Sequence, residues 1–175
     1  MPANIEIKSH ASDFEAQAKV AAALADGPFQ DLDQTDTFFE VSHGRLKLRE
    51  FGDGSAELIQ YQRADHSGPK QSSYLISRTS EPDTLRTALS AALGVRWVVR
   101  KQRRVWLTGA TRMHFDRVEG LGDFIELEVV LGDTLDSEAG HAIAQQLMGR
   151  LGIRPDHLVS GAYVDLLERR AAPVD

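Results

Sequence analysis

The sequence predicts an α+β fold, in which an antiparallel β-sheet of roughly eight strands curls on itself and carries helices on its outside. Segments of alternating polar and apolar residues follow one another with short turns and few interruptions. In residues 45–49 (Arg-Leu-Lys-Leu-Arg), the basic residues share one face of a strand and the leucines share the other. We therefore expect apolar faces under the helices and charged faces toward a wet interior.

The first half of the chain supplies a strand, a helix and a run of hairpins. Residues 12–15 (Ser-Asp-Phe-Glu) match a capping box before an alanine-rich helix at about 15–24, which Gly27 and Pro28 close. Strands are expected at about 3–8, 31–41, 45–51, 56–63 and 72–78. Turn residues at 42–44 and 52–55 predict consecutive hairpins, and 64–70 predicts a longer, mobile loop.

The second half alternates strands with three further helices. One helix is expected at 82–93, because Pro82 suits a first turn and Gly94 stops the helix. The other helices are expected at about 137–151 and 157–169, and the strands at about 95–103, 105–107, 111–118 and 124–131. No repeat or linker divides the chain, so we expect one domain over residues 1–175.

Composition restricts the function. The formal net charge of −6 argues against a DNA-binding protein, which would usually carry a basic surface. The absence of cysteine excludes disulfides and thiolate metal sites. No apolar run approaches the ~20 residues of a membrane-spanning helix, and the N-terminus lacks a signal-peptide pattern. A cytoplasmic protein without membrane contact is expected.

The charged residues expected to face the interior are the candidate site. The basic ones are Lys8, Arg45, Lys47, Arg49, Arg63, Lys101, Arg103 and Arg112, and the acidic ones are Glu6, Glu57, Asp116, Glu126 and Glu128. This basic excess would repel itself unless an anion filled the interior. Arg forks suit phosphate oxygens, and Lys acts as a point charge.

Three of the carboxylates suggest a metal. Glu126 and Glu128 lie two residues apart and point the same way, so they could share a hard cation with Glu6. Oxygen ligands without cysteine favour Mg²⁺ or Mn²⁺, which typically bridge carboxylates and substrate phosphates. A polyphosphate with its metal therefore fits better than a sugar. The alternatives left open are a solvated sheet face and carboxylates paired with Lys or Arg across strands.

Three other polar residues allow two readings each. His114 shares a strand face with Asp116, and a hydrogen-bonded structural role is at least as plausible as a functional one. Tyr61 and Tyr163 could cap the interior or simply pack.

Residues 4–8 (Asn-Ile-Glu-Ile-Lys) resemble the ExExK signature of the CYTH superfamily, the triphosphate tunnel metalloenzymes. The whole chain is similar to the class IV adenylate cyclase-like branch of that superfamily. The other resembling stretches are 34–39, 44–50, 58–63, 99–103, 114–116, 118–128 and 161–167. They follow one another in the family's order from about residue 3 to residue 168, which makes the resemblance specific.

The resemblance implies a closed barrel of eight antiparallel strands whose tunnel binds a small-molecule triphosphate with Mg²⁺ or Mn²⁺. The activities it implies are cyclisation of ATP to cAMP and pyrophosphate, and hydrolysis of thiamine triphosphate, inorganic tripolyphosphate or RNA 5′-triphosphate. A barrel of this kind is compatible with a homodimer, although no segment shows a dimerisation pattern.

Carried over by position, the resemblance assigns roles to individual residues. The metal side consists of Glu6, Glu126, Glu128 and Asp116, which with Lys8 form the implied catalytic group. The phosphate side consists of Lys8, Arg45, Lys47, Arg49, Arg63, Lys101 and Arg103, with Arg112 and Glu57 as weaker matches.

The chain departs from the family pattern at Asn4, where the signature has its first glutamate. An amide oxygen can contact a cation or its waters, but it lacks the full negative charge. Three hypotheses follow: an adenylate cyclase, a triphosphatase, and a non-catalytic binder of phosphorylated metabolites.

Overall fold

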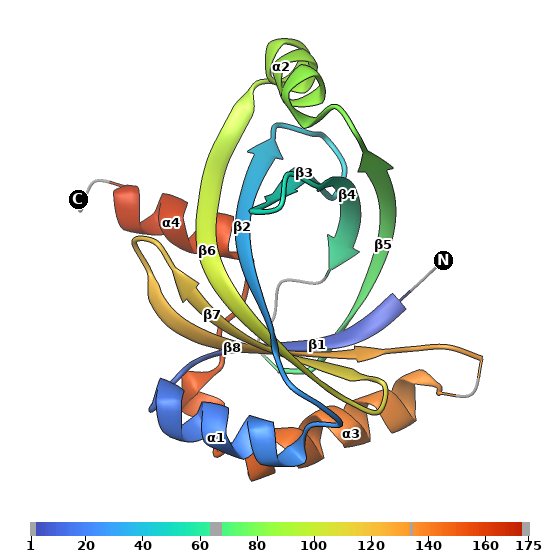
Figure 1. Ribbon diagram of the computed structural model, residues 1–175, viewed down its shortest axis with the longest axis vertical. Helices are drawn as coiled ribbons and strands as arrows, with labels where there is room; N and C mark the ends of the chain where they lie inside the picture. The colour runs from blue at the N-terminus through green and yellow to red at the C-terminus, as the bar shows by residue number, and fades with distance from the viewer. Residues whose placement is uncertain (1–2, 64–67, 134, 173–175) are drawn as a thin grey trace.

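A computed structural model shows a closed barrel of eight antiparallel strands, with four α-helices on the outside and at one end (Figure 1). The structure describes residues 3–63, 68–133 and 135–172, except for the side chain of Arg63. The strands are β1 (Ala3–His10), β2 (Gln30–Phe39), β3 (Arg45–Phe51), β4 (Ala56–Arg63), β5 (Lys70–Thr79), β6 (Val95–Thr108), β7 (Thr111–Val118) and β8 (Gly122–Val130). The helices are α1 (Phe14–Leu24), α2 (Pro82–Leu93), α3 (Ser137–Arg150) and α4 (Tyr163–Ala171), with a short 3₁₀ turn at Pro155–His157. The predicted α+β barrel is confirmed.

Several predicted boundaries are wrong. The strands expected at 95–103 and 105–107 form the single strand β6, because Arg104 continues the alternation and pairs with Phe115 of β7. Lys70, expected in a loop, begins β5 and is buried. The last helix begins at Tyr163 instead of residue 157, because Val159 donates its N–H to the Lys8 carbonyl.

The start of α1 is capped one residue later than the predicted capping box places it. The Asp13 side chain accepts a hydrogen bond from the Ala16 N–H at 3.0 Å, and the Gln17 side chain accepts one from the Asp13 N–H at 3.1 Å. Asp13, and not Ser12, is therefore the N-cap residue. Gly94 ends α2 as predicted, with φ of 82° and ψ of 150°, a conformation essentially restricted to glycine.

Helices α1 and α3 lie side by side across the outside of β1, β7 and β8 (Figure 1). The outward residues of these strands alternate with the inward charged ones, and they form the main apolar core. Phe14 of α1 and Met148 of α3 pack against this core, which includes Ile5, Met113 and Leu127. In the described part of the chain, no helix has the length and apolar run that a bilayer crossing needs.

Residues before and at the start of α4 close one end of the barrel. Val159, Ala162 and Tyr163 pack against lumen-facing apolar residues that include Phe38 and Phe124. Arg96 of β6 holds α4 in place through two bonds to Glu168, at 2.8 and 2.7 Å, and one to Asp165, at 2.9 Å. The barrel interior is therefore a pocket with a floor.

The strand pairings, with the stagger that barrel closure imposes, arrange the inward residues in rings between this floor and the opposite end. The floor ring contains Lys8, Phe38, Val99, Val118 and Phe124. The middle consists of one ring with Glu6, Asp36, Lys47, Tyr61, Ser72, Lys101, Asp116 and Glu126, and a second with Asn4, Gln34, Arg49, Ile59, Tyr74, Arg103, His114 and Glu128. The mouth ring contains Leu32, Phe51, Glu57, Ile76, Val105 and Arg112.

Candidate functional site

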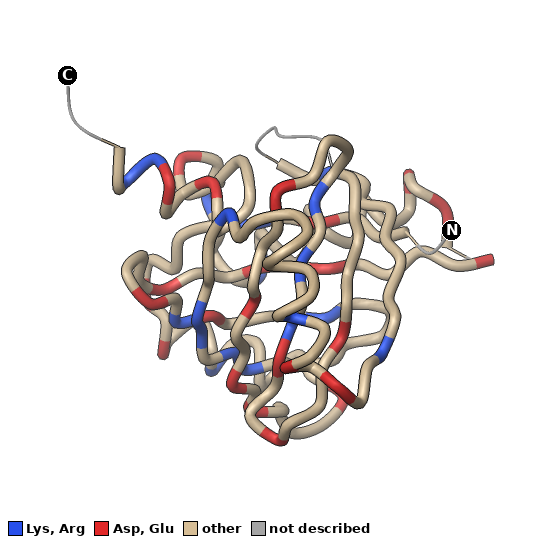
Figure 2. Tube along the Cα trace, turned by 90° about the horizontal axis from the view of Figure 1, so that it is seen from above, with Lys and Arg blue, Asp and Glu red and all other residues tan. Residues whose placement is uncertain are grey.

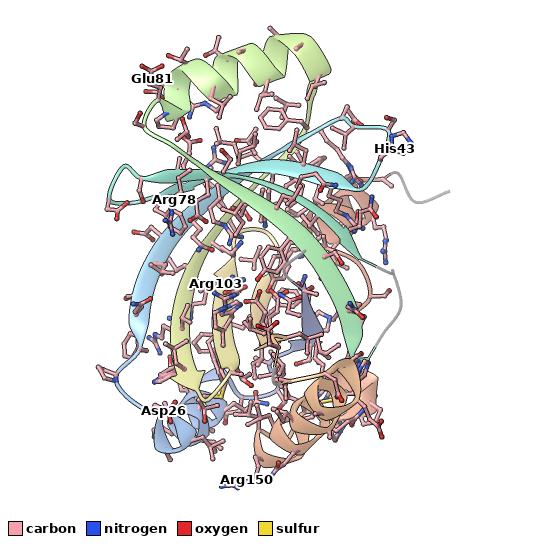
Figure 3. All side chains as sticks on the ribbon, turned by 90° about the vertical axis from the view of Figure 1, so that its right-hand side faces the viewer. Asp26, His43, Arg78, Glu81, Arg103 and Arg150 are labelled. Atoms are coloured by element: carbon pink, nitrogen blue, oxygen red, sulfur yellow. The ribbon has the colours of Figure 1, made fainter. Side chains whose placement is uncertain are left out.

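The lumen contains a cavity of about 290 Å³, which is lined by residues from every strand and by charged residues from every strand except β5. The predicted site residues that line it are Glu6, Lys8, Lys47, Arg49, Glu57, Lys101, Arg103, Arg112, Glu126 and Glu128. Figure 3 shows Arg103 inside the barrel, whereas Asp26, Glu81 and Arg150 lie at its periphery. Six of the eight strands thus bring predicted residues together, whereas β5 and β2 line the cavity with residues that were not predicted, one of them an acidic residue of β2.

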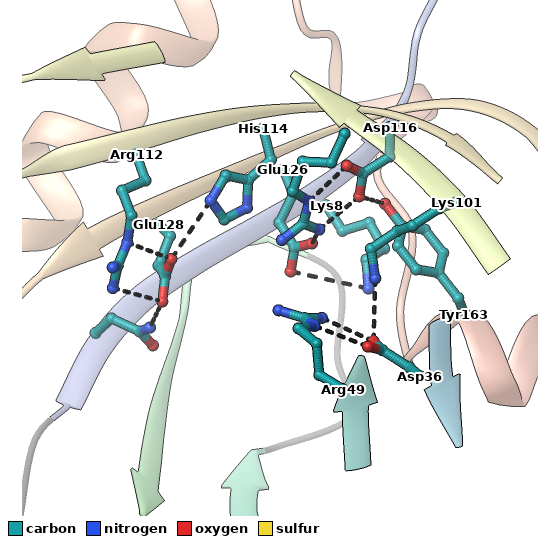
Figure 4. Close-up of polar contacts among 12 residues, drawn as sticks. Lys8, Asp36, Arg49, Lys101, Arg112, His114, Asp116, Glu126, Glu128 and Tyr163 are labelled. Atoms are coloured by element: carbon teal, nitrogen blue, oxygen red, sulfur yellow. Dashed lines mark hydrogen bonds and ion pairs between the residues drawn. The ribbon is translucent and has the colours of Figure 1, made fainter. Parts of the chain in front are cut away.

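The acidic residue of β2 that was not predicted is Asp36, whose side chain faces the middle of the lumen. Its carboxylate accepts two hydrogen bonds from Arg49, both at 2.7 Å, and one from Lys101 at 3.0 Å (Figure 4). A fourth bond comes from Lys47, also at 3.0 Å. Burial would raise the pKa of Asp36, but Arg49, Lys101 and Lys47 hold it well below its ordinary value. Asp36 is therefore ionised, and it offsets part of the basic excess that the sequence predicted.

Arg103 and Asp116 form a second buried ion pair. The Arg103 guanidinium donates two hydrogen bonds to the Asp116 carboxylate, both at 2.6 Å, and one to Glu126 at 3.2 Å. The Tyr163 hydroxyl, from the start of α4, donates to Asp116 at 2.7 Å. Lys8 lies 4.1 Å from the centre of the Tyr163 ring. Tyr163 therefore does more than pack, because it links the floor to the charged middle.

Glu128 is held by neighbours on β7 and β1. Arg112 donates to its Oε2 at 2.8 Å and to its Oε1 at 3.3 Å, the Asn4 side-chain amide also donates to Oε1, and His114 Nε2 lies 3.6 Å from Oε2 (Figure 4). Burial raises the pKa of Glu128 above its ordinary value, and the negative charges of Glu6 and Glu126 add to this effect. Burial also holds the pKa of His114 well below its ordinary value, so the imidazole is neutral.

Two observations bear on whether these carboxylates suit a divalent cation. Glu6 and Glu126 are both close enough to Glu128 to repel its charge, and all three supply hard oxygen donors. Within the described residues, the Asn4 side-chain oxygen is buried and has no hydrogen-bond partner, which provides a further oxygen donor beside them. The donor chemistry fits Mg²⁺ or Mn²⁺. Their arrangement is a separate matter: among the described residues, no group of three His, Asp or Glu side chains is placed so that it could hold a metal ion.

Some predicted residues lie elsewhere. Arg45 is absent from the residues lining the cavity, and it forms an ion pair with Asp165 of α4 at 2.8 Å. Arg63 ends β4, and its side chain lies outside the described part of the structure. Lys70, which was not predicted, is fully buried on the inward face of β5 opposite Glu6.

The mouth of the lumen differs in chemistry from the middle. Leu32, Phe51, Ile76 and Val105 line the cavity there, next to Arg112. Ile76 is 49% exposed although it faces the interior, which leaves apolar surface accessible at the mouth. An anion with an apolar end group matches this arrangement, with its charge in the middle and its apolar group at the mouth.

Anion binding should depend on pH through Lys47. Burial, followed by the neighbouring Arg49 charge, lowers the pKa of Lys47 to about 8. Lys47 is thus a charged ammonium below this pH and a neutral amine above it. An anion binds the ammonium form more tightly, so the affinity for an anion should fall as the pH rises through this value. We expect tripolyphosphate affinity, measured by calorimetry without metal, to fall about tenfold between about pH 7 and about pH 9.

The control for this prediction is Lys47→Met, which removes the titrating group but keeps a side chain of similar length. Its affinity should be lower at pH 7 and should vary much less with pH. An equally steep pH dependence in the variant would assign the effect to another group.

Acidic and basic positions are interspersed along the trace in Figure 2, in a chain of formal net charge −6. A CYTH domain model matches residues 2–163. Adenylate cyclase CyaB of Aeromonas hydrophila is 25% identical over 174 residues, which cover 94% of this chain and 88% of that protein.

Solved structures share the fold. The PH1012 protein of Pyrococcus horikoshii superposes with a TM-score of 0.81 at 23% identity, over 93% of this chain and 98% of that one. HpAC1 of Hippeastrum, described as having a dominant triphosphatase activity, superposes with a TM-score of 0.67 at 15% identity, over 98% of this chain and 97% of that one. From the match over residues 2–163, the chain belongs to the CYTH domain family.

Proposed function

We propose that this protein is a metal-dependent enzyme acting on an organic triphosphate, and that its reaction is the cyclisation of ATP to cAMP and pyrophosphate. The observation that carries the proposal is the lumen itself, where Lys8, Lys47, Arg49, Lys101 and Arg103 surround one cavity behind an apolar mouth. The similarity to Aeromonas adenylate cyclase CyaB supports the choice of reaction.

Phosphoryl chemistry asks a protein mainly for positioning and charge neutralisation. With the adenosine group of ATP at the mouth, the phosphates extend into the middle of the lumen. There the Lys and Arg side chains bind the phosphate oxygens. Arg49 and Arg103 lie in the ring nearer the mouth, and Lys47 and Lys101 lie in the ring nearer the floor. The cations nearer the floor would hold the leaving pyrophosphate while the ribose 3′-hydroxyl attacks the α-phosphorus. The bond between the α-phosphorus and the oxygen that bridges it to the β-phosphate breaks, and the hydroxyl proton passes to water.

Enzymes of this family that act on triphosphates generally require a divalent cation. Here Glu6 and Glu126 would hold Mg²⁺ or Mn²⁺, which when bound supplies charge neutralisation at the phosphate oxygens. Metal-binding roles for Glu128 and Asp116 stay predictions. In this structure Arg112 and Asn4 hold Glu128, and Arg103 and Tyr163 hold Asp116.

A triphosphatase is the second candidate, and the similarity to HpAC1 favours it. In that reaction, water attacks the terminal phosphorus near the floor. The bond from Asn4 to Glu128 motivates a third outcome, binding without turnover, because the amide replaces a carboxylate beside the proposed metal ligands.

The test incubates purified protein with ATP, thiamine triphosphate or tripolyphosphate, each with Mg²⁺ or Mn²⁺, and identifies the products. We expect cAMP and pyrophosphate from ATP. Release of free phosphate would select the triphosphatase instead, and tight binding without product would select the binder. Absence of both binding and turnover for all three compounds would refute the proposal.

A further inference from the structure

Asp36 holds three of the cations that would otherwise face a ligand. Arg49, Lys47 and Lys101 direct four hydrogen bonds to its two oxygens, at 2.7, 2.7, 3.0 and 3.0 Å (Figure 4 shows the Arg49 and Lys101 bonds). Its side chain is 2% exposed, so water contributes little to this arrangement. The carboxylate thus has the kind of surroundings that a bound phosphoryl group would need.

We propose that Asp36 is an internal counter-anion that competes with the ligand's phosphoryl groups and so weakens triphosphate binding. This inference rests on the proposed function, because it assumes that a triphosphate enters the lumen. In the empty lumen, Asp36 alone neutralises part of the charge of the three cations. When a triphosphate binds, its phosphoryl group and Asp36 share these cations.

The argument for competition is electrostatic. A phosphoryl oxygen that shares the Lys101 ammonium with Asp36 lies roughly 5 Å from the Asp36 carboxylate, because two hydrogen bonds from one nitrogen diverge at about the tetrahedral angle. Two negative charges at that distance repel strongly in a site of low effective dielectric constant. Each lysine ammonium has three N–H donors and can contact both anions, so the ligand does not have to expel Asp36. It has to tolerate the negative charge of Asp36.

A purely structural role for Asp36 gives a different expectation. Both roles predict that Asp36→Asn lowers the melting temperature of the empty protein, because Arg49, Lys47 and Lys101 lose their shared anion. They differ in the affinity for an anion. If Asp36 only positions the cations, its loss weakens binding; if it competes with the ligand, its loss strengthens binding.

The test measures the dissociation constant of tripolyphosphate without metal, by calorimetry at pH 7, for the wild type and for Asp36→Asn. We expect about tenfold tighter binding by the variant, together with a lower melting temperature and a larger stabilisation by tripolyphosphate. Met148→Ala is the control for reduced stability alone. This side chain is buried against the outer core, and its loss should lower the melting temperature without changing the dissociation constant.

A second pair of variants keeps the test valid if Asp36→Asn does not fold. Asp36→Asn combined with Lys101→Met restores the charge balance, and it should bind tripolyphosphate about tenfold more tightly than Lys101→Met alone. If the wild type binds tripolyphosphate and the removal of Asp36 leaves binding equal or weaker, this inference is overturned. The proposed function then still stands. Absence of tripolyphosphate binding in the wild type and in all variants also overturns this inference, whereas the proposed function is decided separately by the product assay with ATP and metal.

Discussion

Glu126→Gln should reduce metal-dependent turnover about a hundredfold or more, with only a small change in stability. Glu126 faces the lumen between Lys8, at 3.9 Å, and Arg103, at 3.2 Å. Glutamine keeps the shape of the side chain, so no core cavity opens, but it removes the charge that would hold the cation. Initial rates with ATP and Mn²⁺, and thermal melts without ligand, measure the two effects.

The matched control is Glu50→Gln, which makes the same change in a half-buried glutamate on the outer face of β3. Glu50 is ion-paired with Arg86 of α2. Its turnover should stay within about twofold of the wild type, since surface ion pairs contribute little. Wild-type activity in Glu126→Gln would remove Glu126 from the metal site.

Arg103→Met should lower the free energy of unfolding by about 3–5 kcal/mol at pH 7, which makes it the variant with the largest effect on stability. The loss arises from Asp116, which has no exposed surface and whose carboxylate would keep the Tyr163 hydroxyl as a donor but lose two guanidinium bonds. Burial favours the neutral form of Asp116, and Arg103 outweighs that effect to keep its pKa below the ordinary value. Urea denaturation measures the change.

The double variant Arg103→Met, Asp116→Asn separates the broken ion pair from lost packing. Asparagine carries no charge and can still accept the Tyr163 hydrogen bond, so most of the lost stability should return. If the double variant is as unstable as Arg103→Met alone, the destabilisation comes from packing around residue 103 and not from the unpaired carboxylate.

The alternation of residues along the strands predicted most of the fold and much of the site. On β3 the period of two placed Lys47 and Arg49 on the inward face, and on β8 it placed Glu126 and Glu128 there. Local turn chemistry located the end of α2 at Gly94. These signals are local, so a single sequence contains them.

The parts that the sequence did not predict depend on contacts between distant residues. Asp36 lies on a strand with polar residues on both faces, so alternation does not identify its inward face. Asp36 lies two residues from both Gln34 and Phe38, which line the same cavity, and this spacing is the signal that places it on their face of the strand. Arg45 has the same alternation as Lys47, but it lies one ring nearer the floor, where Asp165 of α4 binds it. Which end of the barrel α4 closes is a tertiary property.

The central claim is that the inward cations of the barrel bind a triphosphate. The most direct measurement is a crystal structure of the protein with Mn²⁺ and a non-hydrolysable ATP analogue. We expect phosphate oxygens within hydrogen-bond distance of Arg49, Lys101 and Arg103, and the adenosine group beside Phe51 and Ile76 at the mouth. An analogue bound on the outside of the barrel, with the lumen unchanged, would contradict the account.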